Sequence, residues 1–269
     1  MAMTMDAPEI HEIHALDEAF DRDRFLLVQK RIAINEKYYI SDDHNQRILF
    51  VERPSHLLRQ LLALSAALLS VTVCIILGGG IASLLKGQPE GWQATAGLGG
   101  IGLGFVLGVV AFALLYPKRH VTFYRDDTRR ERLLSITQVN RIQLLFSHFE
   151  ILDELGAPLA RLRKNQLTNI FRKRWVAFTP TGKSLCVALE DSLLLAMVRR
   201  FVGPMMGALR TNYIIVAGDG TNERLLGKFD RKFTLFDQYV LDMTADPKRE
   251  LDRRVALAVG VLLDTGERR

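Results

Sequence analysis

The chain has 269 residues, of which 48% are hydrophobic, and it carries a formal net charge of +6 at pH 7. This length suits one large domain or two small ones. Only two cysteines occur, Cys74 and Cys186, which excludes a disulfide framework and a cysteine-based metal cage and fits a protein in a reducing cytosol.

The first 24 residues are acidic. Residues 1–24 contain seven acidic side chains against two basic ones, and they lack the basic start and apolar core of a secretory signal peptide. His11 and His14 have the spacing of metal ligands, but no third ligand accompanies them. We therefore expect residues 1–24 to be a flexible tail without a metal site.

Two long uncharged segments come next, residues 60–85 and 92–116, and a short loop containing Pro89 separates them. A helix as long as the first segment would measure ~39 Å, more than the hydrocarbon core of about 30 Å requires. A pair of buried helices in a soluble protein is the alternative, but two such runs in succession favour a membrane. Residues 57–117 are therefore predicted to form a transmembrane helical hairpin.

Basic side chains flank this predicted hairpin. Arg53 and Arg59 precede it, and Lys118, Arg119 and Arg125 follow it, whereas the loop between the segments holds one Lys and one Glu. The positive-inside rule places both flanks in the cytosol. We expect a two-pass integral membrane protein with both termini cytosolic.

Small residues recur at every fourth position in both segments. The rows are Ala66, Ser70, Cys74 and Gly78 in the first and Gly100, Gly104 and Gly108 in the second. Such rows allow two helices to approach closely. We expect the two segments to pack against each other through these residues; the alternative is a homo-oligomer that forms through a row left exposed.

The rest of the sequence repeats one unit, an apolar strand, a polar turn and a second apolar strand. Five copies begin at Tyr38, Val121, Phe149, Trp175 and Tyr213. Turn centres near Asp126, Glu154 and Thr181 lie 28 and 27 residues apart, as expected of successive antiparallel hairpins. The longer gaps coincide with a Leu- and Met-rich insert, residues 193–209, and with the helical hairpin. The hairpin is therefore predicted to interrupt one domain, whose first strands lie in residues 25–52.

The end of the sequence changes to a helical pattern. Asp246 and Pro247 suit an N-cap and a first helical position, and residues 255–263 are nine consecutive uncharged residues. Nine residues are too few to cross a bilayer, so this helix is expected to be buried in protein. Many short antiparallel strands around it predict a mainly β fold, a closed β-barrel around a C-terminal apolar helix.

Four stretches resemble the tubby-like superfamily, in particular its phospholipid scramblase and LURP-one-related branch. They are RFLLVQKRIAINEKYYI from Arg24, RTNYIIV from Arg210, KFDRKFTLFDQYVLDM from Lys228 and LDRRVALAVGVLLD from Leu251. The resemblance implies a twelve-stranded barrel around a central C-terminal helix. Residues 25–56 and 118–269 would then form one cytosolic barrel domain.

The resemblance also suggests a ligand. Tubby proteins bind phosphoinositides through basic side chains on the barrel, and the nearest group of this kind is Arg161, Arg163, Lys164, Arg172, Lys173 and Arg174. Arg161 and Arg163 project to the same face of a strand, so the group could bind anionic headgroups; the alternative is an ordinary solvated face. Animal scramblases carry an acidic calcium segment before the last helix, but Asp237, Asp242 and Asp246 lack the Gly and Glu of an EF-hand.

Known catalytic patterns do not fit the sequence. Gly182, Lys183 and Ser184 imitate the end of a P-loop but lie between two strands, and the GxGxxG at Gly97 lies inside an uncharged helix. No catalytic triad or cofactor site is defensible. We predict a non-enzymatic, membrane-anchored module that binds phospholipid headgroups and assists lipid movement, without cofactor, metal or nucleic acid. The alternative is a tethered scaffold whose residues 193–209 recruit a protein partner.

Overall fold

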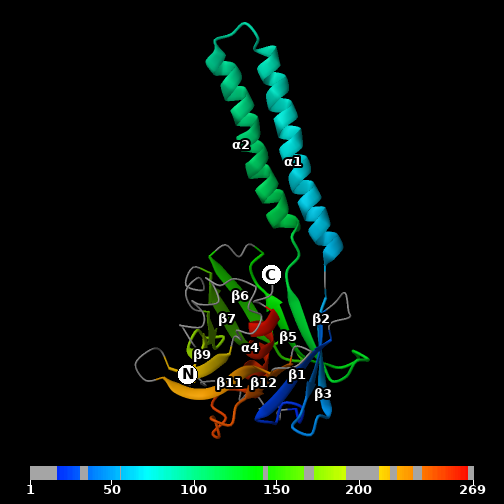
Figure 1. The fold of residues 1–269 in the computed structure, drawn as a ribbon, viewed down its shortest axis with the longest axis vertical. Coiled ribbons are helices and arrows are strands. Elements are labelled where there is room, and N and C mark those ends of the chain that lie inside the picture. Colours follow the sequence, from blue (N-terminus) through cyan, green and yellow to red (C-terminus); the bar gives the residue numbers. More distant parts are fainter. Residues whose placement is uncertain are drawn as a thin grey trace, which may run out of the picture.

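The computed structural model describes residues 17–30, 36–54, 56–141, 145–166, 173–191, 212–218, 223–232 and 238–265. Within these residues, twelve strands form a closed antiparallel barrel, as the sequence predicts, and two long helices project from one end of it (Figure 1). The strands are β1 (Arg24–Lys30), β2 (Glu36–Ser41), β3 (Arg47–Arg53), β4 (His120–Tyr124), β5 (Arg132–Gln138), β6 (Phe146–Leu152), β7 (Pro158–Asn165), β8 (Arg174–Phe178), β9 (Ser184–Glu190), β10 (Tyr213–Ala217), β11 (Arg224–Lys232) and β12 (Gln238–Asp242). The helices are α1 (Leu57–Leu84), α2 (Glu90–Leu115) and α4 (Arg253–Thr265).

The predicted strand pairs are confirmed for all five repeats, β2 with β3, β4 with β5, β6 with β7, β8 with β9 and β10 with β11. Side chains alternate between the two faces of the wall, so that Phe149 and Ile151 of β6 join the main hydrophobic cluster. Short polar side chains hold the turns. The Asp153 carboxylate accepts hydrogen bonds from the N–H groups of Leu155 (3.0 Å) and Ala157 (2.7 Å).

The two helices α1 and α2 are an insertion between neighbouring strands of the barrel. Strand β3 before them pairs directly with β4 after them, with Phe50 opposite Tyr124 and Glu52 opposite Thr122. Strand β1 pairs with β12 and closes the wall. Strands on both sides of the hairpin thus belong to one closed sheet, as the repeat predicts.

Helices α1 and α2 are long and apolar enough to cross a membrane, and they lie side by side (Figure 1). Their polar side chains are satisfied within the helices. The Ser70 hydroxyl donates to the carbonyl oxygen of Ala66 (2.8 Å), and the Thr95 hydroxyl donates to that of Gly91 (2.7 Å). Such internal bonds suit a medium without water, because a polar group in hydrocarbon has no other partner.

Glycines bring the two helices into backbone contact. A Cβ atom on Gly100 would lie 2.7 Å from the carbonyl oxygen of Cys74 and 2.8 Å from the Cα atom of Gly78. A Cβ atom on Gly104 would lie 2.9 Å from that of Cys74, and one on Gly108 would lie 3.1 Å from the helix α1 backbone. The predicted row Gly100, Gly104 and Gly108 therefore packs against α1 within one chain. It meets Cys74 and Gly78 of the other predicted row, but Val71 and Ala67 in place of Ser70 and Ala66.

Helix α4 is buried along its length. Residues 255–263 are all buried. Their apolar side chains are each at most 3% exposed and share one hydrophobic cluster with the inner side chains of the strands. At Gly260 a Cβ atom would lie 3.1 Å from the Phe229 ring. At the end of the helix, the buried Tyr38 hydroxyl donates to the Asp264 carboxylate (2.5 Å). The predicted burial of this segment is confirmed.

The predicted start of this helix is wrong. The helix begins at Arg253 instead of Pro247, and Asp252 caps it by accepting a hydrogen bond from the N–H of Arg254 (2.8 Å). The Asp246 carboxylate instead accepts the N–H groups of two residues further along an irregular turn. Tertiary contacts of Asp246 hold it in this turn, outside the helix that it was predicted to cap.

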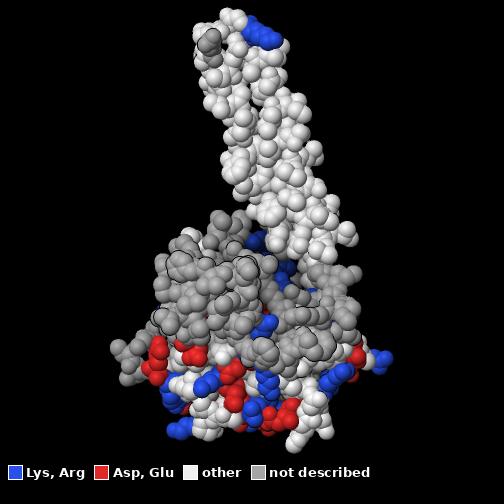
Figure 2. All heavy atoms as spheres, viewed as in Figure 1, with Lys and Arg blue, Asp and Glu red and all other residues white. Residues whose placement is uncertain are grey.

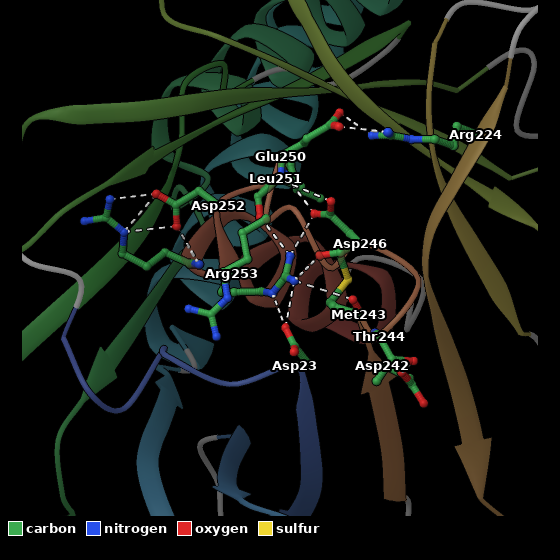
Figure 3. A network of polar contacts seen from close by, with 12 residues as sticks. Asp23, Arg224, Asp242, Met243, Thr244, Asp246, Glu250, Leu251, Asp252 and Arg253 are labelled. Carbon is green, nitrogen blue, oxygen red and sulfur yellow. Dashed lines mark hydrogen bonds and ion pairs between the residues drawn. The ribbon is translucent and has the colours of Figure 1, made fainter.

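The contacts that hold Asp246 in this turn are made by Arg253, whose side chain is 1% exposed (Figure 3). Its guanidinium donates to the carboxylates of Asp23 (2.7 Å) and Asp246 (2.9 Å) and to the carbonyl oxygens of Asp246 (2.8 Å) and Leu251 (3.0 Å). Asp23 directly precedes β1. One buried cation thus joins the first strand of the barrel to the start of the last helix.

Candidate membrane-binding surface

The barrel has two chemically different rims. Neighbouring strands of the barrel run in opposite directions. The odd-numbered strands therefore end, and the even-numbered strands begin, on one rim, and α1 and α2 emerge from this rim between β3 and β4 (Figure 1). We call this the hairpin-proximal rim and the opposite one the distal rim. Any surface that contacts a bilayer spanned by the hairpin must lie on the hairpin-proximal rim.

Basic side chains gather on the hairpin-proximal rim. They include Lys37, Arg53, Lys118, Arg119, Arg141, Lys173, Arg174, Arg231 and Lys232, and Arg59 lies in the first turn of α1. Figure 2 shows blue atoms beneath the foot of the hairpin, whereas red and blue atoms are interspersed at the opposite end. Some of the distal basic residues form ion pairs, for example Arg24 with Asp242 (3.2 Å). The hairpin-proximal rim therefore combines positive charge with two uncharged helices.

Electrostatics at the rim reflect this charge. His120, at the start of β4, has a pKa below its ordinary value, first because it is partly buried and then because His56 and Lys118 are close. Each of these neighbours disfavours a further positive charge. The foot of the hairpin is therefore an electropositive environment.

Arg125 corrects the sequence interpretation. It was expected to flank the membrane, but it follows β4 on the distal rim. There its guanidinium donates to Glu131 (2.6 Å) and Asp17 (2.5 Å), which raises the pKa of Arg125. A strand of five residues separates it from the foot of the hairpin, so it does not contribute to the positive rim.

The predicted headgroup-binding group is split by the structure. Arg161 points outward from β7 and pairs with Glu150 (3.0 Å). Arg163 also points outward, with its guanidinium carbon 5.2 Å from the centre of the Phe146 ring. Lys164 is wrongly placed in the group, because it faces inward, is 5% exposed and lies over the Trp175 ring. The same alternation that puts Arg161 and Arg163 on one face puts Lys164 on the other.

The rest of that group lies at the start of β8. Lys173 is half-buried and Arg174 is exposed, and both lie on the hairpin-proximal rim. Arg172 lies outside the described residues. The structure therefore assigns Lys173 and Arg174 to the positive rim, while Arg161 and Arg163 lie further along the outer wall.

Arg141 was not identified from the sequence. It follows β5, and its guanidinium donates to the carbonyl oxygen of Leu114 in the last turn of α2. A cation at a helix C-terminus satisfies an otherwise unpaired carbonyl and opposes the negative end of the helix dipole. Twenty-seven positions separate these residues, and the pairing of β4 with β5 brings them together, because it returns the chain to the start of β4 and the foot of α2.

Among the described residues, no group of three or more His, Cys, Asp or Glu side chains is placed to hold a metal ion. Asp242 accepts hydrogen bonds from Thr244, and Asp246 binds Arg253. Asp237, the third residue considered for calcium, lies outside the described residues.

Comparisons of the chain with protein-family models, with curated proteins and with solved structures give no match.

Proposed function

We propose that this protein is a non-enzymatic module of the tubby-like, scramblase-related type, anchored by a two-pass hairpin, that binds anionic phospholipid headgroups. The barrel closes around α4, both termini lie in the cytosol, and the hairpin-proximal rim faces the bilayer. One observation carries the proposal: basic side chains lie on the rim of the barrel from which the two uncharged helices emerge. Each Lys or Arg near an anionic surface contributes about 1 kcal/mol of attraction.

Electron spin resonance of spin-labelled lipids tests this with the full-length protein in vesicles. Labelled phosphatidylserine should associate with the protein more strongly than labelled phosphatidylcholine. The double variant Lys173→Gln, Arg174→Gln should reduce this preference by up to about tenfold, and added salt should reduce it too. The matched control Arg130→Gln, Arg132→Gln removes the same charge from the distal rim and should leave the preference unchanged. Equal association of the two lipids would overturn the proposal.

Lipid movement is the transport form of this function. A dye-labelled lipid assay on vesicles containing the full-length protein distinguishes it from simple tethering, because only transport exposes inner-leaflet dye to an external quencher. Recruitment of a protein partner depends on residues 193–209, which lie outside the described residues.

A further inference from the structure

Large apolar side chains that are exposed on the described part of the barrel are few and unevenly placed. They are Val139, Leu145, Phe146, Leu155 and Leu225. The first three flank a single connection, between β5 and β6, on the hairpin-proximal rim. Leu155 and Leu225 lie at the distal rim, in the turn after β6 and in the first residues of β11. One corner of the hairpin-proximal rim is therefore apolar as well as near the positive charges.

This corner is directly beside the foot of α2. Arg141, from the same connection, donates to the carbonyl oxygen of Leu114 in the last turn of the helix. Leu114 and Leu115 are themselves exposed. Arg141 thus joins the connection that carries the apolar corner to the end of α2, where the exposed side chains are also apolar.

Polar groups border the apolar side chains on the barrel wall. The guanidinium of Arg163 lies over the Phe146 ring, with 5.2 Å between the guanidinium carbon and the ring centre. His148 lies beside the same ring and its Nδ1 atom is 3.1 Å from the Asn140 amide. An aromatic ring with an apolar face and a cation stacked on it suits the boundary between headgroups and acyl chains.

We infer that this corner is a second membrane contact, in which Val139, Leu145 and Phe146 enter the headgroup–acyl boundary beside α2. Arg141 and Arg163 then lie at the level of the headgroups. The inference rests on the proposed function, because it needs α2 to cross the bilayer. A lipid surface is the occupant that the structure favours, since Arg141 ties the patch to the end of a helix that is long and apolar enough to span a membrane. The barrel would thereby be held at a fixed orientation to the membrane.

Site-directed fluorescence tests the inference in the full-length protein reconstituted in vesicles. A Cys74→Ala, Cys186→Ala background receives one new cysteine, labelled with an environment-sensitive dye. Leu145→Cys reports on the corner, and Leu155→Cys, which replaces a side chain 72% exposed on the distal rim, is the matched control. Ile76→Cys, on the outer surface of α1, reports separately on the hairpin.

Nitroxide lipids should quench the dye at position 145 at least about twofold more than the dye at position 155, and its emission should be blue-shifted. Quenching at position 76 without quenching at position 145 would overturn the inference and leave the spanning hairpin standing. Absence of quenching at both positions would overturn the proposed function as well. A blue shift at position 145 without lipid quenching would indicate a protein occupant, and that result also rejects the inference.

Discussion

A buried charge such as Arg253 is expected to contribute more to the free energy of unfolding of this barrel than an ion pair on its surface. Arg253 binds two carboxylates and two carbonyl oxygens while 1% exposed, whereas Arg224 and Glu250 form an ion pair with both side chains about half exposed. Burial makes the difference, because removal of one buried partner leaves the other charge without water or a counter-ion. An exposed pair loses little when it is broken.

Arg253→Met should therefore lower the free energy of unfolding by about 3–5 kcal/mol. Asp246, whose pKa is set by opposing effects of burial and of hydrogen bonds from Leu251 and Arg253, would lose one of the interactions that keep it ionised. Denaturant unfolding monitored by tryptophan fluorescence measures the loss. Arg224→Met, the control, should cost at most about 1 kcal/mol. Equal losses in the two variants would contradict the role of burial.

His120 should make the foot of the hairpin sensitive to acid. Its pKa lies below the ordinary value of 6.5 because of burial and then because of His56 and Lys118, so the folded protein takes up this proton less readily than the unfolded chain. Its contribution to stability is thus complete above pH 6.5 and falls as the pH drops below that value. The midpoint of thermal unfolding should fall less between pH 7.5 and 5 in His120→Gln than in the wild type. His44→Gln, in an exposed distal turn, should follow the wild type; a fall unchanged by His120→Gln would refute the assignment.

At this scale the sequence predicted less than it could have. The prediction grouped Arg161, Arg163 and Lys164 by their charge. Side chains alternate between the two faces of a strand, so the sequence already places Lys164 on the opposite face from the other two. The contact of Arg141 with α2 is different, because it follows from the predicted pair of β4 and β5 only once the register of the two strands is known.

Whole elements were more predictable. Strand and turn patterns are local, so five hairpins and two long helices follow from the sequence alone. The start of α4 does not follow from the sequence, since Asp246 and Asp252 are both residue types that can cap a helix. In the structure Asp246 binds Arg253, which also binds Asp23, and Asp252 is the cap. Helix ends set by tertiary contacts are beyond local rules.

Gly100→Val should disrupt the packing of α1 against α2. A Cβ atom there would meet the Cys74 and Gly78 backbones within 2.8 Å, and a backbone cannot move aside as a flexible side chain does. We expect a loss of about 1–3 kcal/mol, measured as a lower thermal midpoint of helix circular dichroism in detergent. Gly102→Val, where no atom lies within 4 Å of a Cβ, is the matched control and should melt like the wild type.

For the whole molecule, the central result is that one closed wall contains strands from both sides of the hairpin. The gap between repeats predicted this insertion, because its excess length is close to that of the hairpin. Paired strands such as β3 and β4 are only about 5 Å apart, so their ends could be joined by a short turn.

Replacement of residues 57–115 by a short Gly-Ser linker should therefore yield a soluble, monomeric barrel. Its far-ultraviolet spectrum should be β-rich, and denaturant should unfold it in one cooperative transition. The same excision combined with Arg253→Met serves as the destabilised comparison and should unfold at lower denaturant. An aggregated product from the simple excision would show that the helices are needed for the barrel to fold.

The insertion also imposes an order on synthesis. When the hairpin leaves the ribosome, β1 to β3 have been made but lack their partners β4 and β12. At about 5–20 residues per second, the remaining strands take roughly 6–25 s to follow. For that time the outer edges of β1 and β3 remain unpaired, because β2 lies between them and their other partners have not been made. Chaperones that shield β-edges should therefore influence the yield of the protein more than its final stability.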